Sequence, residues 1–146
     1  MFGICFGAQL LCRVLGGRVR RMPDGPEMGW LRIETSAPEV VGPGPWLAWH
    51  FDGMDLGPDT VEVARSPRGC HAFVHGPHVG VQFHPEATTE SVRVWAARYG
   101  DSLDGLGADP AAVVAETRER TGGGSRLTDE LVDRVLAHAG VLPRTP

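Results

Sequence analysis

Apolar positions follow two different spacings near the start of the chain. Residues 2–5 form a short apolar run that predicts the end of a buried strand. From residue 8 to residue 15 the apolar positions recur at helical spacing, and the pair Gly16-Gly17 is a typical helix stop. Residues 18–22 (RVRRM) are short and alternating, which indicates another strand. The chain therefore opens with a strand, a tight turn and a helix.

Alternating apolar and polar positions dominate the middle of the chain. Two stretches rich in Pro and Gly interrupt them, residues 23–29 and most of residues 38–59, and we expect both to be loops. Between and after these loops the pattern predicts strands over residues 30–36, 46–50, 60–66, 70–76 and 79–83.

The last third of the chain changes to helical spacing. Residues 88–100 predict a helix that Tyr99-Gly100 ends. A second helix is expected over residues 109–124, with Pro110 in its first turn, and a third over residues 127–140. A length of 146 residues suits a single domain with a real core.

Charge and composition exclude several function classes. The net charge is −4, so no basic surface is expected for nucleic acid. All 14 basic residues are arginines, which excludes a P-loop lysine and a lysine Schiff base. The absence of asparagine excludes a Cys-His-Asn triad. We expect no cofactor.

The cysteines and the hydropathy pattern predict a cytoplasmic protein. The three cysteines Cys5, Cys12 and Cys70 have no regular spacing, which argues for reduced thiols rather than a disulfide framework. No positive region follows Met1 as it would in a signal peptide. No apolar run approaches the roughly 20 residues of a spanning helix, so we expect no membrane partner.

The first candidate for chemistry is the cysteine in GICFG, residues 3–7. A cysteine at a glycine-flanked strand-to-helix turn has the arrangement of a nucleophile elbow, with its side chain exposed. The positive end of the following helix favours the thiolate of Cys5. The N–H of Phe6 is free to stabilise an oxyanion. The alternative is that Cys5 is simply a small buried apolar residue.

The second candidate is HPE at residues 84–86. A buried strand runs into His84, and Pro85 prevents the strand from continuing. The carboxyl edge of an open α/β sheet is where such folds place their sites. Glu86 is close enough in sequence to orient the imidazole of His84. The alternative is a structural histidine followed by a solvated glutamate.

A metal site is not expected. His71, His75, His78 and His84 are close in sequence, and Cys70 is nearby. Their spacing matches no known ligand pattern.

Taken together, the two motifs resemble the class I (triad-type) glutamine amidotransferases. The family signature is an elbow of the form G-x-C-x-G-x-Q and a late H-P-E, which here are residues 3–9 and 84–86. Further stretches resemble the GMP-synthase-like stand-alone branch: PEMGW at 26–30, WHFD at 49–52 and AFVHGPHVGVQFHPEAT at 72–88. His71 departs from the glutamine that the family often has at that position. The resemblance covers residues 2 to about 100.

The resemblance implies an α/β, flavodoxin-like fold of three layers with a central, mostly parallel sheet that is N-terminally incomplete. It implies that residues 1–100 are the C-terminal portion of an amidotransferase domain and that residues 101–146 are a C-terminal helical extension. His50 and Asp52 would border the site.

The resemblance also implies a role for each motif residue. Cys5 attacks the side-chain amide of glutamine, His84 acts as the base and acid, and Glu86 orients His84. Phe6 supplies one oxyanion donor through its N–H, and Gln9 contacts the bound glutamine. A γ-glutamyl thioester forms, water releases glutamate, and an ammonia-accepting synthetase is the expected partner.

Two alternatives to a glutaminase stay open. The substrate could be another γ-glutamyl compound, or the chain could be a truncated, non-catalytic remnant that acts as an interaction module. Relatives carry further strands and a glycine loop before the elbow, so a strand at residue 2 predicts that the short chain lacks part of its sheet.

Overall fold

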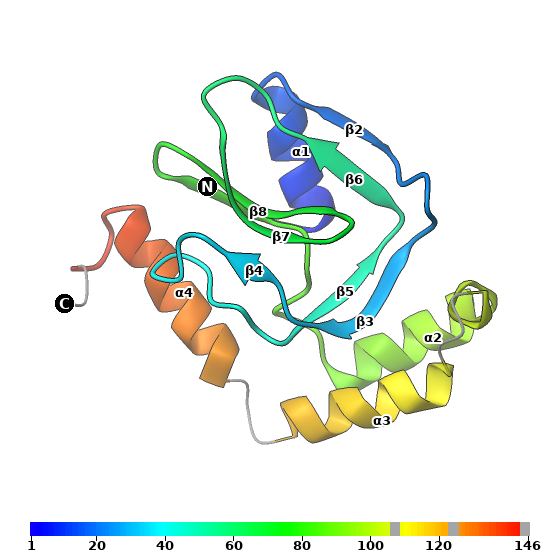
Figure 1. The fold of residues 1–146 in the computed structure, drawn as a ribbon. Coiled ribbons are helices and arrows are strands. Elements are labelled where there is room, and N and C mark those ends of the chain that lie inside the picture. The colour runs from blue at the N-terminus through cyan, green and yellow to red at the C-terminus, as the bar shows by residue number, and fades with distance from the viewer. Residues whose placement is uncertain (106–108, 123–125, 144–146) are drawn as a thin grey trace.

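The computed structural model describes residues 1–105, 109–122 and 126–143, which form an α/β fold (Figure 1). The helices are α1 (Phe6–Val14), α2 (Thr89–Asp104), α3 (Pro110–Thr121) and α4 (Arg126–His138). The strands are β1 (Phe2–Ile4), β2 (Arg18–Arg21), β3 (Glu27–Leu31), β4 (Glu34–Thr35), β5 (Trp46–His50), β6 (Asp52–Asp55), β7 (Val61–Ser66), β8 (Gly69–His75) and β9 (His78–Val81).

The main sheet has five strands in the order β1-β9-β8-β7-β4. β1 and β9 are parallel, with Gly3 opposite Gly80, and the other neighbours are antiparallel. Among the described residues the sheet is therefore mixed rather than mostly parallel. The reason is that β7, β8 and β9 follow one another through short turns, and only antiparallel strands can be joined so tightly.

Helices cover both faces of this sheet, which makes three layers (Figure 1). On one face Val79 and Val81 of β9 pack in a core cluster with Leu131 and Val135 of α4. On the other face Phe73 of β8 joins a cluster with buried residues of α1. The alternation of side chains along each strand assigns neighbouring residues to opposite faces.

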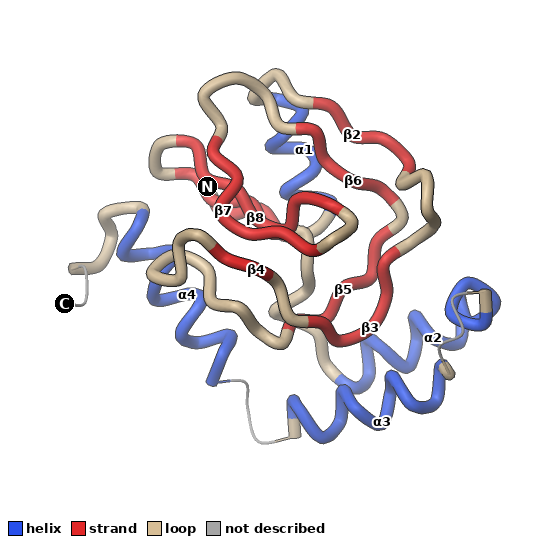
Figure 2. Tube along the Cα trace, viewed as in Figure 1, coloured by secondary structure: helices blue, strands red, loops and turns tan. Residues whose placement is uncertain are grey.

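The remaining strands form two antiparallel pairs, β2 with β6 and β3 with β5 (Figure 2). The helices α2 and α3 lie side by side and cover β3 and β5. Trp30 of β3 donates a hydrogen bond from Nε1 to Oγ1 of Thr117 on α3, at 2.9 Å. Among the residues that the structure describes, no helix has the length and apolar character needed to cross a bilayer.

The structure differs from the sequence-based expectation in four elements. β3 begins at Glu27, inside the stretch expected to be a loop, and the strand expected over 30–36 is divided between β3 and β4. β6 was not expected, because its residues Asp52–Asp55 are mostly polar and pair only with distant β2. The helical backbone of α2 is interrupted at Tyr99 (φ −126°, ψ 21°), where an end was expected, but a second helical part continues beyond this kink to Asp104. Positions 123–124 of the expected second helix lie outside the described residues.

Candidate active site

Cys5 lies at the junction of β1 and α1, in an unusual backbone conformation. Its φ of 47° and ψ of −105° are values that non-glycine residues rarely adopt. The N–H of Cys5 donates to the carbonyl of Val81 at 2.8 Å, and its own carbonyl accepts the first helical hydrogen bond, from Gln9 N–H at 3.0 Å. Such strained residues persist only where their surroundings hold them. Here the parallel partner strand and the helix do so together.

The two glycines that flank Cys5, Gly3 and Gly7, differ in how much space a side chain would have. A Cβ on Gly3 would lie 2.8 Å from backbone atoms of Gly7, so β1 and α1 approach too closely for any side chain. A Cβ on Gly7 would meet nothing within 4 Å. Close packing therefore requires a glycine at position 3 and does not require one at position 7.

His84 and Glu86 form a direct pair after the end of β9. The N–H of His84 donates to the carbonyl of Leu47 at 2.8 Å, which ties the residue to β5. Nδ1 of His84 lies 2.7 Å from Oε1 of Glu86. The His84 side chain is 13% exposed and that of Glu86 is 51% exposed. The imidazole is thus enclosed, while its carboxylate partner faces solvent.

The charge state of His84 depends on Cys5 and Glu86. Burial alone lowers the pKa of an imidazole, but hydrogen bonds and charge interactions with Cys5 and Glu86 raise the pKa of His84 to about 9. Because Nδ1 faces Glu86, Nε2 is the nitrogen left for Cys5. The three residues proposed from the two sequence motifs therefore lie next to one another.

Helices α2 and α4 support His84 and the loop that carries it. The ring of Trp95 on α2 packs against the imidazole, with centroids 4.8 Å apart. Thr128 at the start of α4 donates from Oγ1 to the carbonyl of Pro85 at 2.8 Å. Neither residue was singled out in the sequence, because helical periodicity does not indicate which distant loop a helix contacts.

The two residues expected to bind substrate have different surroundings. Phe6 has a side chain that is largely exposed, and its N–H belongs to the first turn of α1, where the helix supplies no acceptor. Gln9 is buried, and its Nε2 donates to Oε1 of Gln82 at 3.2 Å and to the carbonyl of Asp52 at 3.4 Å.

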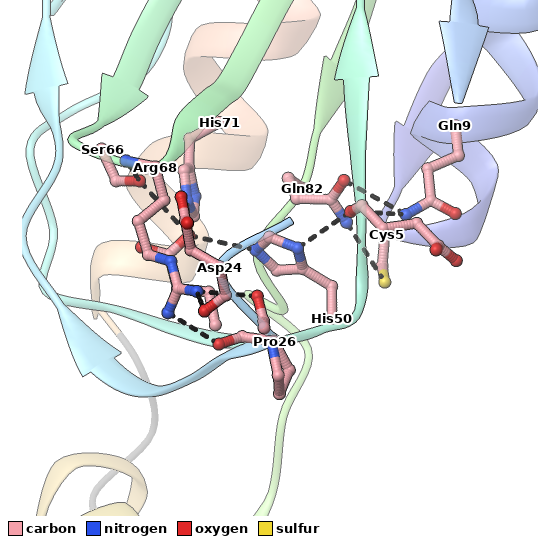
Figure 3. Close-up of polar contacts among 12 residues, drawn as sticks. Cys5, Gln9, Asp24, Pro26, His50, Ser66, Arg68, His71 and Gln82 are labelled. Atoms are coloured by element: carbon pink, nitrogen blue, oxygen red, sulfur yellow. Dashed lines mark hydrogen bonds and ion pairs between the residues drawn. The ribbon is translucent and has the colours of Figure 1, made fainter. Parts of the chain in front are cut away.

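Gln82 is a site residue that sequence reasoning missed. It is fully buried, and its Nε2 donates to Sγ of Cys5 at 3.5 Å (Figure 3). The signal in the sequence was a single amide side chain in an apolar strand, VGVQF, since a buried polar side chain needs partners.

A buried polar cluster lies beyond Gln82 (Figure 3). Oε2 of Glu27 is 2.7 Å from Nε2 of His71 and 3.3 Å from Nε2 of His50, and it accepts from Ser66 Oγ at 3.2 Å. Burial opposes ionisation of Glu27, but the hydrogen bonds from His50, His71 and Ser66 hold its pKa well below the usual range. His71, which departs from the family pattern, thus has a structural partner.

The same cluster contains side chains that could bind a metal ion. Glu27, His50 and His71 each offer one ligand atom, and these three atoms lie within 4.8 Å of one another. The contacts of Glu27 with His71 and Ser66 are hydrogen bonds, and the carboxylate already has three polar neighbours. The other histidines of the sequence cluster, His75, His78 and His84, have separate partners in Thr60, Met1 and Glu86.

Cys12 and Cys70 differ from Cys5 in their surroundings. Both are buried and free, whereas Cys5 is partly exposed. Burial raises the pKa of the Cys12 thiol and, more strongly, that of Cys70.

The sequence matches a known family. The profile "Glutamine amidotransferase class-I" matches residues 1–93, more than half of the chain. GMP synthase [glutamine-hydrolyzing] from Mycobacterium leprae is 32% identical over 142 residues, which are 87% of this chain and 27% of that protein. A GMP synthase [glutamine-hydrolyzing] subunit from Methanococcus vannielii is 33% identical over 97 residues, which are 60% of this chain and 51% of that protein.

A solved structure has the same fold. A glutamine amidotransferase from Thermotoga maritima superposes with a TM-score of 0.77 at 30% identity, over 92% of this chain and 61% of that one. The chain thus spans about half or less of these curated relatives and under two thirds of this structure. The flavodoxin-like fold and the GMP-synthase-like resemblance expected from the motifs are confirmed. The chain belongs to the class I glutamine amidotransferase family.

Proposed function

We propose that this chain hydrolyses the side-chain amide of glutamine through a Cys5-His84-Glu86 triad. The observation that carries the proposal is the position of His84, which interacts with Cys5 and, through Nδ1, with Glu86 at 2.7 Å. A nucleophile, a base and a carboxylate that orients the base are the three roles that covalent amide hydrolysis requires.

Each step can be assigned to these residues. The Cys5 sulfur attacks the amide carbon of glutamine, and the carbon–nitrogen bond breaks as protonated His84 gives its proton to the leaving ammonia. The product is a γ-glutamyl thioester on Cys5. His84 then takes a proton from water, the resulting hydroxide attacks the thioester carbon, and the carbon–sulfur bond breaks to release glutamate. Glu86 stabilises the imidazolium in each half of the cycle.

Phe6 and Gln9 are the proposed substrate contacts. The N–H of Phe6 has no acceptor within the helix, because it lies in the first turn of α1, and it is suited to bind an oxyanion formed at the amide carbon. The amide nitrogen of Gln9 donates one hydrogen to Oε1 of Gln82 and the other to the carbonyl of Asp52. Gln9 is therefore left with its oxygen as an acceptor, which suits the ammonium group of glutamine.

We infer that the ammonia is passed to a synthetase. The named relatives are GMP synthases, and the one from Methanococcus vannielii is a single subunit, which supports an acceptor enzyme on the same or a separate chain. The three free thiols support a cytoplasmic location.

The test is ammonia release from L-glutamine by the purified chain, with a parallel assay of γ-glutamyl amides of other amines. We expect little turnover from this short chain, which Cys5→Ser and His84→Ala should abolish and Thr117→Val, on α3, should retain. Preferential turnover of another γ-glutamyl compound would reassign the substrate. Turnover of glutamine that survives Cys5→Ser would refute the triad.

A further inference from the structure

We propose that Gln82 stabilises the Cys5 thiolate as a fixed hydrogen-bond donor, held in orientation by Gln9. This proposal adds a residue to the site described above and rests on Cys5 being the reactive thiol. The donor is Nε2 of Gln82, which lies 3.5 Å from Sγ of Cys5 (Figure 3). Gln82 is 0% exposed, so no water competes for this amide.

The orientation of the Gln82 amide follows from its neighbours. A backbone carbonyl can only accept hydrogen bonds, so the Gln9 atom that contacts the carbonyl of Asp52 is the nitrogen. The same nitrogen then donates to Gln82, which must present its oxygen to Gln9. The nitrogen of Gln82 is thereby directed at the sulfur of Cys5.

The far end of this chain of hydrogen bonds is anchored in the buried cluster. The carbonyl of Asp52 also accepts from Nδ1 of His50 at 3.0 Å. Nε2 of His50 faces the carboxylate of Glu27, which is also bound by His71. In addition, the backbone N–H of Gln82 donates to the carbonyl of His71 at 2.8 Å. The cluster therefore holds both the acceptor for Gln9 and the strand that carries Gln82.

The sulfur thus has polar partners of two kinds. His84, whose charge Glu86 balances, is a base that changes its protonation during the reaction. Gln82 does not titrate, and it can only donate from this nitrogen. A neutral donor next to the sulfur favours the thiolate over the thiol and leaves proton transfer to His84.

The experiment measures alkylation of Cys5 by iodoacetamide as a function of pH, by mass spectrometry of the Cys5 peptide. The variant Gln82→Met keeps the length of the side chain and removes the donor. We expect the midpoint of the rate–pH curve to move up by about one pH unit, so that alkylation below the midpoint is about tenfold slower. Gln82→Glu, which replaces the donor by an acceptor, should move the midpoint further.

The matched control is Thr117→Val, which also removes buried hydrogen bonds but lies on α3 away from Cys5. It should leave the midpoint unchanged. An unchanged midpoint in a folded Gln82→Met protein, checked by circular dichroism, would overturn the proposal. If Gln82→Met does not fold, the variant Gln9→Met tests the proposal instead. It frees the amide of Gln82 to rotate, so the midpoint should still move up, by less than is expected for Gln82→Met. An unchanged midpoint in Gln9→Met would then refute the role of Gln82.

Alkylation does not need glutamine turnover, so this test is separate from that of the proposed function. A midpoint shift in a protein without glutaminase activity would support the role of Gln82 and count against glutamine hydrolysis. Full glutaminase activity in the wild-type protein, with no midpoint shift in Gln82→Met, would support glutamine hydrolysis and refute the role of Gln82.

Discussion

The reactivity that we propose for Cys5 rests on its position rather than on its residue type. Three cysteines occur in the chain, and two of them are ordinary buried thiols. Cys5 differs because β1 ends one residue before it and α1 begins one residue after it, at a backbone conformation with positive φ. That junction leaves its side chain partly exposed, beside His84 and Gln82.

Selective labelling of Cys5 is the first prediction. A glutamine-like electrophile or iodoacetamide at neutral pH should modify Cys5 and leave Cys12 and Cys70 unmodified, because burial disfavours both thiolates and blocks access. Peptide mapping by mass spectrometry gives the site. The Cys5→Ser protein, used as the control, should take up no label while folded, and equal labelling of all three cysteines would contradict the assignment.

A second prediction concerns the link between His84 and Cys5. The pKa of His84 is raised to about 9 by Cys5 and Glu86 despite burial, so Cys5→Ser should lower it. Nuclear magnetic resonance of the imidazole nitrogens measures the change, with His138, which contacts the carbonyl of Gly76, as the internal reference. An identical His84 titration in both proteins would show that the sulfur does not influence the imidazole.

This raised pKa also affects folding stability. A group whose pKa is higher in the folded than in the unfolded state stabilises the fold below its unfolded pKa, about 6.5 for histidine. That contribution is lost as the pH rises through about 9.

At the scale of elements, α4 is part of the core rather than a surface attachment. Leu131 and Val135 pack against the main sheet, and Thr128 hydrogen-bonds the loop that carries His84. The helix therefore buries one face of the sheet and supports the candidate active site at the same time.

The third prediction tests this packing. Leu131→Ala should lower the free energy of unfolding by about 2–5 kcal/mol, because Leu131 is 2% exposed and its removal leaves a cavity. Val132→Ala is the matched control on the same helix, since Val132 is 41% exposed, and it should change stability by less than about 0.5 kcal/mol. Urea denaturation measures both, and equal effects would show that α4 does not pack as described.

The fourth prediction concerns the cluster that joins β3, β5 and β8. The pKa of the buried Glu27 carboxyl is well below its ordinary value of 4.5, so its stabilising contribution is present above about pH 4.5 and is lost as the pH falls further. Glu27→Gln should cost about 1–3 kcal/mol at pH 7, because the amide cannot replace both carboxylate oxygens as an acceptor and so leaves buried polar atoms unsatisfied. In the Glu27→Gln protein the free energy of unfolding, measured by urea denaturation, should also fall less steeply as the pH is lowered below about 4.5. The control Glu39→Gln, at an exposed position, should change neither the stability at pH 7 nor its dependence on acid pH.

At the scale of the whole molecule, we propose that residues 1–100 and the helical extension 101–146 fold as one unit. α3 contacts α2 and is tied to β3 through Thr117, and α4 packs on the main sheet. Contacts between the two portions are therefore made on two separate surfaces.

The fifth prediction is a single cooperative unfolding transition. Far-UV circular dichroism reports the helices, and tryptophan fluorescence reports residues such as Trp46 and Trp49, which are buried near the sheets. The two probes should give the same urea midpoint. A first transition that removes helical signal alone would show that the extension unfolds independently.

The order of residues alone was enough to predict most local elements and the family. Helical spacing predicted all four helices, and the motifs around Cys5 and His84 predicted the family that the profile match confirms. Both signals are local: they depend on the order of residues within one turn, one strand or one motif, and that order is visible without the fold.

Which residues surround Cys5 and His84 depends on the tertiary structure. Gln82, Trp95 and Thr128 contact the site from the end of β9, from α2 and from α4, and the pairing of β6 with β2 appears in no local pattern. The buried contact between Glu27 and His71 joins positions 44 residues apart. Periodicity indicates which side of an element is buried but not what it is buried against, because that depends on how strands and helices far apart in the chain are packed together.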